Sequence, residues 1–523
     1  MPNASVAADC QKDVIAFLES PANHSPEPKQ VERIDTHGAM IFLAGDLAYK
    51  IKRAVRLPYL DFSTLDRRFT ALQREYELNI RTAPSLYLGI SPIFRTTDGR
   101  LSWEGEGEII EYVLVMRRFE QSQLLDQMAV EGKLGEELMG PLADRIVAAH
   151  DRTDVHTDVD PVGSFEAIFA NVTAALSRRQ SPISPDEAAG YRDDALKALR
   201  DAAPLMRLRT QQGFVRRCHG DLHLGNIVLL DGEPTLFDAL EFDETLAIID
   251  VLYGIAFLLM DLYRRGLRKH ACSVFNQYLQ GQDGIRHLDG LALLPIFLSS
   301  RAAIRAMVAL DRKSALSADR ASTVDDEVRE YFRLAREFLA PPPQRLVAVG
   351  GLSGTGKTTL ARLLAPELHP VPGALHLRSD VERKIMYEQD PQSPLPEDAY
   401  SPEITAHVYQ RLCEKAEQAL RAGHSVIVDA VFATESERRD VEQSARNAGA
   451  EFAGLWLVAP IEVLCARVAA REGDASDADV QVVRQQLSYD VGSIDWQTID
   501  CNAEPGEVHA RAAAAIGLKR GVP

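Results

Sequence analysis

The sequence predicts two folds in succession: an α+β region with a small sheet and many helices, then an α/β domain with a parallel sheet. Strand patterns gather between residues 31 and 118, and helical periodicity dominates from 120 to 339. From residue 345 onward, short apolar strands alternate with helical runs, which is typical of a parallel sheet with helices on both faces. Three prolines at 341–343 form a stiff spacer between the two patterns. We therefore predict a first domain at 1–340, a linker at 341–344 and a second domain at 345–523.

The sequence predicts the order of strands and helices in the first region. Two strands are predicted on either side of a Gly-Asp turn, at 39–46 and 47–52. A helix follows at 66–82 and another strand at 108–116. The most apolar stretch, 251–260, lies between acidic residues and is too short to cross a bilayer, so it predicts a buried helix.

In the second region, an apolar strand at 345–350 leads through a glycine-rich loop into a helix at 357–364. The later strands of the parallel sheet are predicted within the segments 374–378, 425–429, 452–458 and 496–500.

Composition and charge narrow the classes of partner. The chain has 523 residues, of which 46% are hydrophobic, so it can bury more than one core. Its formal net charge of −18 argues against binding to nucleic acid or to an anionic membrane surface, and favours a small neutral or cationic substrate. The six cysteines form no C-x-x-C pair, and the first residues lack the basic and apolar runs of a signal peptide. We expect a cytoplasmic protein with reduced thiols.

A dense polar stretch in the first region carries a catalytic pattern. It runs from His219 through Asp221 and His223 to Asn226, and a strand–turn–strand then leads to Asp238. In kinase folds an Asp at the first position accepts the proton of the substrate hydroxyl, while the Asn and the second Asp hold Mg²⁺ on the nucleotide phosphates. The spacing thus predicts Asp221 as the base, with Asn226 and Asp238 as metal ligands.

This stretch meets the H-G-D-x-H-x-x-N motif in full, and residues 31–339 resemble an aminoglycoside-phosphotransferase-type kinase. The resemblance implies a bilobal, protein-kinase-like fold with a small lobe at about 31–118 and a helical lobe at about 119–339. It also implies a strand lysine that holds the nucleotide phosphates and pairs with a helix glutamate, by position Lys50 and Glu75. Lys52 lies on the same strand face and Glu77 on the same helix, so both stay open as alternatives. No G-x-G-x-x-G loop lies near residue 40, which keeps a non-catalytic nucleotide-sensing module as the other hypothesis for this half.

The second region begins with a phosphate-binding loop. The segment 351–358 fits G-x-x-x-x-G-K-[ST] without a mismatch and lies between a buried strand and a helix. Lys357 is expected to reach the β- and γ-phosphates, and the Thr358 hydroxyl to hold Mg²⁺. The residues predicted to contact the nucleotide here are Gly351, Ser353, Gly354, Thr355, Gly356, Lys357, Thr358 and Thr359.

Further along this half, charged residues follow strands at the edge where open α/β sheets bind ligands. Asp380 and Arg383 lie one helical turn apart, which suits a base that takes a hydroxyl proton beside a guanidinium that holds the acceptor. Asp429 ends the next strand, as a carboxylate that contacts Mg²⁺ or its water would. Arg467 and Arg471 are spaced to close over the phosphates as a lid, and an exposed helix face is the plainer reading of the pair.

Residues 345–523 resemble the small P-loop kinases, a group that includes gluconate kinase, chloramphenicol phosphotransferase and zeta-type toxins. The resemblance rests on the order of phosphate loop, D-x-x-R, third strand with Asp and lid arginines. The whole chain is similar to bacterial bifunctional proteins and is predicted to be an ATP- and Mg²⁺-dependent kinase acting on a small-molecule hydroxyl. A toxin-like kinase acting on a nucleotide sugar is a further hypothesis for this half.

Overall fold

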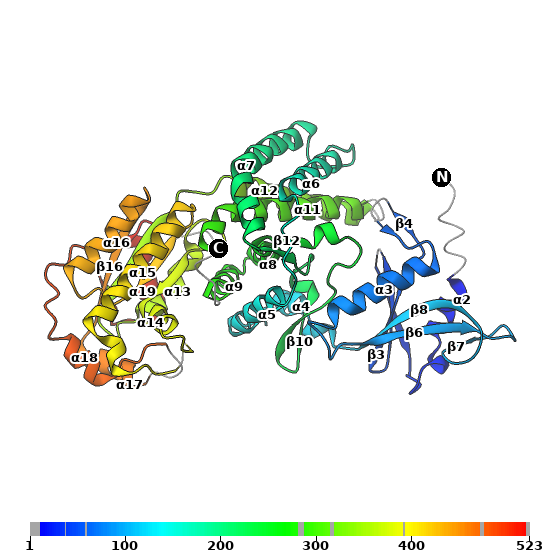
Figure 1. Ribbon diagram of the computed structural model, residues 1–523, viewed down its shortest axis with the longest axis horizontal. Coiled ribbons are helices and arrows are strands. Elements are labelled where there is room, and N and C mark those ends of the chain that lie inside the picture. Colours follow the sequence, from blue (N-terminus) through cyan, green and yellow to red (C-terminus); the bar gives the residue numbers. More distant parts are fainter. Residues whose placement is uncertain are drawn as a thin grey trace. The chain divides into compact units, whose positions relative to one another are not determined.

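The structure, a computed structural model, describes residues 11–36, 38–57, 60–280, 287–313, 318–390, 393–470 and 475–518 (Figure 1). Its contacts divide the chain into two compact units, each of which is described by itself. The first unit comprises Met1–Val159 and Gln212–Ile255, and the second comprises Asp160–Gln211 and Ala256–Pro523. The proline-rich segment 341–344 has no regular secondary structure and lies within the second unit.

The first unit is built on a six-stranded antiparallel sheet of order β1-β2-β3-β8-β6-β7. Its strands are β1 Val31–Asp35, β2 Ala39–Ala44, β3 Leu47–Lys52, β6 Tyr87–Arg95, β7 Leu101–Ser102 and β8 Glu108–Arg117. Helix α3 (Leu65–Asn79) lies across one face, and α2 (Lys12–Glu19) packs on the other (Figure 1). The predicted strands at 39–52 and 108–116 are confirmed. The helix ends at Asn79 rather than at 82, because Pro84 disfavours helical backbone just before it.

Alternation along β3 decides which side chains face α3. Tyr49 and Ile51 belong to the core shared with α2, whereas Ala48 packs in the core that contains Leu72 of α3. Successive strand residues point to opposite faces, so Lys50 and Lys52 lie on the α3 face with Ala48. The strand therefore presents two lysines to the helix that carries Glu75.

Short elements complete the first unit and shape its polar loop. They are β4 Arg56–Leu57, β5 Leu60–Asp61, α4 Leu125–Val130, α5 Met139–Asp151, β9 Val215–Arg217, β10 Ile227–Leu230, β11 Glu233–Leu236 and β12 Ile248–Asp250. Strands β10 and β11 form a hairpin whose turn residues Asp231 and Gly232 have φ of 51° and 84°. This tight turn brings the end of β11, just before Asp238, back beside Asn226 at the start of β10.

The helical part of the second unit packs around the apolar helix α11. Its helices are α6 Pro161–Leu176, α7 Pro185–Gln211, α9 Arg268–Gln280, α11 Leu294–Lys313 and α12 Ala318–Leu339, and α8 Val251–Arg264 runs into it from the first unit. Residues Asp289–Lys313 are long and apolar enough to cross a membrane, but 67% of the 18-residue apolar window within them is buried inside the fold. Helix α11 packs against α12 and α6, as the central helix of a core does. Helix α8 contains the buried helix predicted at 251–260.

The second unit also contains a five-stranded parallel sheet of order β14-β15-β13-β16-β17. Its strands are β13 Arg345–Gly351, β14 Leu375–Arg378, β15 Val426–Asp429, β16 Glu451–Val458 and β17 Gln497–Asp500. Its helices are α13 Lys357–Leu364, α14 Ser379–Met386, α15 Pro402–Arg421, α16 Glu435–Asn447, α17 Ile461–Ala469, α18 Val480–Gln486 and α19 Pro505–Ala515. Helices α13 and α19 share a core with one face of the sheet, and α15 and α16 also contact β13. The predicted fold class, a kinase-like α+β region followed by a P-loop α/β sheet, is confirmed.

The order of this sheet predicts where a ligand binds. After β13 the chain moves outward to β14 and returns through β15, and only then builds β16 and β17 on the other side. Ligands of open α/β sheets bind at the carboxyl ends of the strands where the order reverses. Gly351, Arg378 and Asp429 are the last residues of β13, β14 and β15, so the site lies at that edge.

Candidate functional site

The phosphate-binding loop joins β13 to α13 in a backbone conformation that glycine supports. Gly354 and Gly356 have φ of 86° and 89°, in the left-handed region that other residues rarely adopt. A Cβ at Gly354 would lie 2.7 Å from the carbonyl oxygen of Leu464, so the loop also passes close to α17. The glycines therefore let the backbone N–H groups curl around the amino end of α13.

Two hydrogen-bond donors of this loop donate to oxygen atoms of the protein itself. Lys357 Nζ donates to the carbonyl oxygen of Leu352 at 3.2 Å, and the Ser353 N–H donates to Gln486 Oε1 at 2.7 Å. Both acceptors are neutral, so anionic phosphate oxygens would be stronger partners for the same donors. The loop thus fits a nucleotide phosphate. Gln486 lies on α18, far from the loop in sequence, and no motif marked it.

The carboxylate of Asp429 contacts this loop directly. It is buried at the end of β15, and Thr358 Oγ1 donates to its Oδ2 at 2.6 Å. Burial alone would raise the pKa of Asp429, but the hydrogen bond and charge of His376, with the charges of Lys357 and Arg378, lower it to about 2. Asp429 is therefore ionised at any ordinary pH.

Thr358 and Asp429 together supply the hard oxygen ligands that Mg²⁺ prefers. In the part of the chain that the structure describes, no group of three or more His, Cys, Asp and Glu side chains is placed to hold a metal ion. Mg²⁺ commonly takes one or two protein ligands and completes its shell with phosphate oxygens and water. The pair thus fits a magnesium ion carried by a nucleotide.

Asp380 and Arg383 lie at the start of α14 and line the same cavity as the loop. Burial raises the pKa of Asp380, as does the negative charge of Asp429, against the opposing charge of Lys357. Arg383 donates to the carbonyl oxygen of Ala399 at 2.6 Å and lies over the ring of Tyr400, 4.9 Å from its centre. A carboxylate with a raised pKa beside a fixed guanidinium suits proton transfer from an acceptor hydroxyl.

Asp477 joins the segment before α15 to the loop before α18 and to α14. Its carboxylate accepts hydrogen bonds from Lys384 Nζ at 2.8 Å, from the Tyr400 hydroxyl at 2.5 Å and from the Leu395 N–H at 3.1 Å. Hydrogen bonds from these groups lower the pKa of Asp477, although burial acts in the opposite direction. The segment before α15 is thereby tied to the loop before α18, beside α14, which carries Asp380 and Arg383.

Arg467 lines this cavity and donates to the carbonyl oxygen of Cys501 at 2.9 Å. Arg471, the other predicted lid arginine, lies outside the described residues. The lid role of the pair stays a prediction.

All of these groups open into one cavity of about 1290 Å³. Residues of α15, α16 and α18 contribute to its lining. Besides Asp380, Asp429 and Asp477, the carboxylates that line it are Glu414 and Glu417 on α15, Glu437 and Asp440 on α16, and Asp490 after α18. Three of them, Asp440, Glu414 and Glu417, act on Cys413, whose thiol pKa is raised to about 11 by burial and then by their negative charges. The lining of this cavity therefore carries many more carboxylates than the three already described.

The first unit holds a second charged site, centred on Glu75 of α3. Lys50 Nζ lies 2.6 Å from Glu75 Oε1, and Lys52 Nζ lies 2.7 Å from Glu75 Oε2. Glu77 instead lies 3.8 Å from Arg74 at the surface. The structure therefore places Glu75, and not Glu77, between the lysines, and it brings both candidate lysines to that carboxylate.

Asp238 reaches the same lysine from the end of the hairpin. Its Oδ1 lies 2.7 Å from Lys50 Nζ, and its backbone has φ of 58°. The Asp238 N–H donates to the Tyr87 hydroxyl at 3.1 Å, and the Ala239 N–H donates to Asn79 Oδ1 at 2.9 Å. Burial opposes the ionisation of Asp238, but the charge of Lys50 outweighs it and lowers the pKa.

The network extends to a residue that the motif does not contain. Lys52 forms an ion pair with Glu241 as well as with Glu75. Burial raises the pKa of Glu241, partly against the charge of Lys52. Glu241 lies three residues after Asp238 but belongs to no recognised motif, and the two groups that hold the Asp238 segment lie far from it in sequence, so the motif did not identify them.

The predicted catalytic loop is held next to these charges. Asn226 Nδ2 donates to the Asp221 carbonyl oxygen at 2.9 Å and to Asp221 Oδ2 at 3.1 Å. His223 Nδ1 accepts from the Gly225 N–H at 3.1 Å, and His219 Nε2 lies 2.8 Å from the Phe237 carbonyl oxygen. Asp221 is close enough to Asp238 for its charge to act on the pKa of that residue. The three predicted catalytic and metal-binding residues are thus assembled in one place, and both histidines bond the loop backbone.

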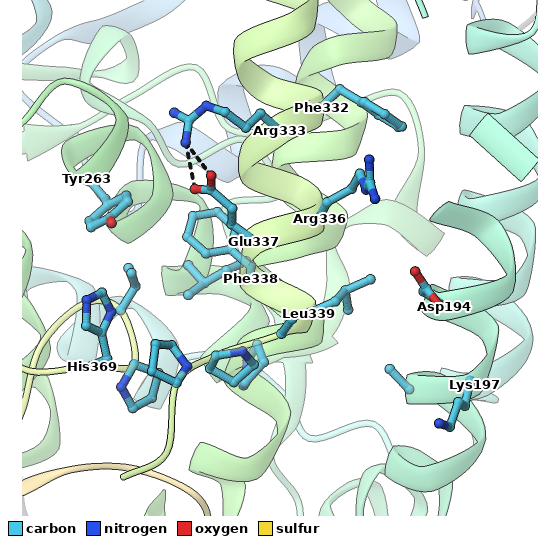
Figure 2. Close-up of a pocket in the computed structure, with 18 of the residues that line it drawn as sticks. Asp194, Lys197, Tyr263, Phe332, Arg333, Arg336, Glu337, Phe338, Leu339 and His369 are labelled. Atoms are coloured by element: carbon cyan, nitrogen blue, oxygen red, sulfur yellow. Dashed lines mark hydrogen bonds and ion pairs between the residues drawn. The ribbon is translucent and has the colours of Figure 1, made fainter. Parts of the chain in front are cut away.

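A further cavity of about 1130 Å³ lies in the second unit between α7 and α12 and beside the segment 369–371. Figure 2 shows Asp194 and Lys197 on α7, across from Arg336 on α12, with the ion pair between Arg333 and Glu337 at 2.6 Å. Among the described residues that line it, none is predicted to act in catalysis or to bind a nucleotide or metal.

Comparisons with known proteins match the whole chain and its parts. The family described as AAA domain (AAA_33) matches residues 346–489, which confirms the predicted P-loop domain. Over 472 residues the chain is 30% identical to the uncharacterized protein Rv2004c of Mycobacterium tuberculosis (strain H37Rv), covering 88% of this chain and 90% of that protein. Over 150 residues it is 33% identical to the cytidylate kinase of Methanopyrus kandleri, covering 27% of this chain and 68% of that enzyme.

Among solved structures, the choline kinase from Cryptosporidium parvum Iowa II is similar to a large part of the chain. It is 12% identical, covers 62% of this chain and 95% of that chain, and has a TM-score of 0.39.

Proposed function

The chain belongs to the family of the Mycobacterium tuberculosis protein Rv2004c, and we propose that it is an ATP-dependent phosphotransferase with two kinase-type sites. At each site the γ-phosphoryl group of ATP passes to a hydroxyl of a small molecule. The carrying observation is that one cavity of the second unit combines the phosphate loop, the Thr358–Asp429 pair and the Asp380–Arg383 pair. A nucleotide-binding loop alone is compatible with many functions. A carboxylate of raised pKa beside it can also act as the general base that takes the proton of an acceptor hydroxyl.

The proposed reaction at the second unit assigns a role to each of these residues. Asp380 accepts the proton of the acceptor hydroxyl while the acceptor oxygen bonds to the γ-phosphorus. The bond between that phosphorus and the bridging oxygen breaks, and ADP leaves with the electron pair. Lys357 stabilises the charge on the phosphate oxygens, and Arg383 orients the acceptor. Bound Mg²⁺, held by Thr358 and Asp429, would neutralise the charge that develops on the transferred group.

The charge of the cavity lining supports one class of acceptor. Four carboxylates on α15 and α16, together with Asp490 after α18, line the same cavity as Asp380 and Arg383. An acceptor that already carries phosphate or carboxylate groups would be repelled by these carboxylates, while hydroxyl compounds that are neutral or carry amines would not. The proposed acceptor is therefore a neutral or cationic alcohol, and a nucleotide sugar is disfavoured.

For the first unit, the same proposal gives Asp221 the role of base, with Asn226 and Asp238 for the metal and Lys50 for the phosphates. A second function is favoured by one contact. Lys50 lies 2.7 Å from Asp238, so the metal-binding carboxylate is already neutralised by the phosphate-binding lysine. A unit that binds nucleotide as a signal, without transferring phosphate, is consistent with this arrangement.

Labelled ATP with a pool of small metabolites tests the proposal. The full chain and its Asp221→Ala and Asp380→Ala variants are incubated with γ-labelled ATP and Mg²⁺, and labelled products are separated. We expect one product to disappear with each variant, and exposed Asp158→Ala to lose neither. If only the Asp380-dependent product exists, while calorimetry of a Lys357→Ala variant still detects Mg²⁺–ATP binding, the first unit is the sensing module. The absence of any labelled product from the wild type would contradict the whole proposal.

A further inference from the structure

The parallel sheet of the second unit has an exposed backbone edge at β14, which is its outermost strand. On its inner side β14 pairs with β15, and the Leu375 N–H donates to the Ser425 carbonyl oxygen at 2.9 Å. Backbone groups alternate in direction along a strand, so the carbonyl of Ala374 and the N–H of His376 point outward. An edge strand of this kind needs a cover for these groups.

Helix α9, from the predicted first domain, covers that edge through Asn276. Its Nδ2 donates to the Ala374 carbonyl oxygen at 3.1 Å, and its Oδ1 accepts from the His376 N–H at 2.7 Å. One side-chain amide thus makes the two hydrogen bonds that a peptide group of a neighbouring strand would make. The helix and the sheet lie in the same compact unit.

Apolar contacts fix the helix at this position. Cys272, one turn before Asn276, belongs to the core cluster that also contains Leu360 of α13 and Ile427 of β15. The ring of Phe275 lies 4.9 Å from that of His424, which precedes β15. A Cβ at Gly373 would lie 2.9 Å from Cys272 Sγ, so the strand approaches the helix as closely as glycine allows. These contacts leave Asn276 little freedom to move away from β14.

The covered strand leads directly into the catalytic groups. His376 Nε2 lies 3.4 Å from Asp429 Oδ2, and Asp429 accepts the hydrogen bond of Thr358. Two residues after the strand ends comes Asp380. The position of β14 therefore sets the position of the base relative to Lys357 and Thr358, which belong to β13 and α13 and not to β14.

We infer that Asn276 is a positioning residue for the phosphotransferase site of the second unit, and that helix α9 is a built-in part of that site. The inference rests on the proposed function. It also goes beyond it, because it makes the predicted first domain necessary for catalysis at the P-loop. A misplacement of about 1 Å can lower a rate roughly a hundredfold, so loss of this amide acts on the chemical step.

The test uses the full chain in an Asp221→Ala background, so that turnover reports the second site. The variants are Asn276→Ala, the milder Asn276→Asp, which keeps the acceptor for the His376 N–H, and the control Lys269→Ala, exposed on the same helix. Release of phosphate from Mg²⁺–ATP is measured for kcat and KM. We expect Asn276→Ala to lower kcat by about 10- to 100-fold with KM for ATP nearly unchanged, because the phosphates are held by the loop. The kcat of Asn276→Asp is expected to lie between those of Asn276→Ala and the Asp221→Ala background. The kcat of Lys269→Ala is expected to equal that of the background.

Hydrogen–deuterium exchange of the peptide covering 374–380 provides a readout that needs no turnover. Asn276→Ala is expected to speed exchange there and to leave exchange in the 351–359 loop unchanged. Unchanged exchange at 374–380 overturns the inference even if the protein hydrolyses no ATP. A kcat equal to the background, or a loss that only follows a lower folded fraction in melting curves, overturns it as well. Absence of turnover in the wild type with the expected exchange pattern contradicts the proposed function alone.

Discussion

The two candidate sites of this chain differ in the groups that they offer to a nucleotide phosphate. In the second unit, one continuous loop from Gly351 to Thr359 presents backbone N–H groups and a single lysine at the amino end of α13. In the first unit, side chains from β3, α3 and the segment after β11 meet in a buried ionic network. A backbone cradle depends on local conformation, whereas the ionic network depends on how distant segments pack.

The electrostatic balance differs as well. In the first unit two lysines are matched by three carboxylates, so the protein neutralises its own cations before any ligand arrives. In the second unit Lys357 and the Ser353 N–H donate to uncharged oxygens of Leu352 and Gln486, and the charge of Lys357 also acts on Asp380 and Asp429. Ligand phosphates would therefore replace uncharged hydrogen-bond acceptors of these two donors at the second site, and would compete with direct ion pairs at the first.

The largest expected effect tests whether the sites are independent. Asp380→Asn and Asp221→Asn each remove a general base while keeping size, which costs about 10²- to 10⁴-fold in rate. Each variant should therefore suppress its own phosphorylated product by that factor and leave the other product unchanged. Quantifying both products from one reaction measures this. If either variant suppresses both products, the two sites form a single reaction centre and the comparison breaks down.

The next largest effect separates the two lysines of the first unit. Lys52 and Glu241 have side chains that are 4% and 10% exposed, whereas the side chain of Asp238, the partner of Lys50, is 42% exposed. Breaking a buried ion pair leaves an uncompensated charge and costs about 3–5 kcal/mol. Lys52→Met should therefore lower the free energy of unfolding by about that amount. Lys50→Met should lower it less, because water can reach Asp238, and should mainly weaken nucleotide binding. Urea unfolding and ATP titration of both variants measure this, and equal losses of stability would refute the distinction.

A smaller effect is expected from adding one methyl group to the backbone cradle. Gly354→Ala forces a strained φ and places a Cβ against the carbonyl oxygen of Leu464. Backbone strain of about 1–3 kcal/mol corresponds to roughly a 5- to 150-fold weaker affinity for Mg²⁺–ATP at the second site. Gly449→Ala is the matched control, since φ is also positive there but no atom lies within 4 Å. Equal nucleotide affinity in Gly354→Ala and in the control would argue against a tight cradle.

The smallest effect concerns pH. The proposed magnesium ligand Asp429 has a pKa lowered to about 2, so it stays ionised in mild acid, while the pKa of Asp380 is raised by burial. A base must be deprotonated to act, so lowering the pH through the raised pKa of Asp380 removes activity. The acid limb of the second product should therefore have its midpoint above the ordinary aspartate value of about 3.9. A rate profile between pH 4 and 8 checks this, and a flat profile down to pH 4 would exclude Asp380 as the base.

The comparison also explains which site residues could be predicted. The phosphate loop, the catalytic loop and the D-x-x-R pair are short runs with fixed spacing, because the backbone geometry between their members is local. Most groups that hold these runs in place come from segments far away in the sequence. They include Gln486 on the loop, Asp477 beside Asp380 and Arg383, and Tyr87 and Asn79 behind Asp238. Glu241, which pairs with Lys52, lies near Asp238 but belongs to no motif.

By itself the sequence determined the order of folds, the two motif-bearing loops and the residue types that meet a phosphate, since hydrophobic periodicity and local spacing specify strands, helices and turns. Only the tertiary structure decided that Glu75 pairs with both lysines, that five further carboxylates line the cavity of Asp380, and that Asn276 of α9 covers the edge of β14. These outcomes depend on packing between segments far apart in the chain. A single sequence contains both residues of such a contact but does not indicate that they lie together in the folded chain.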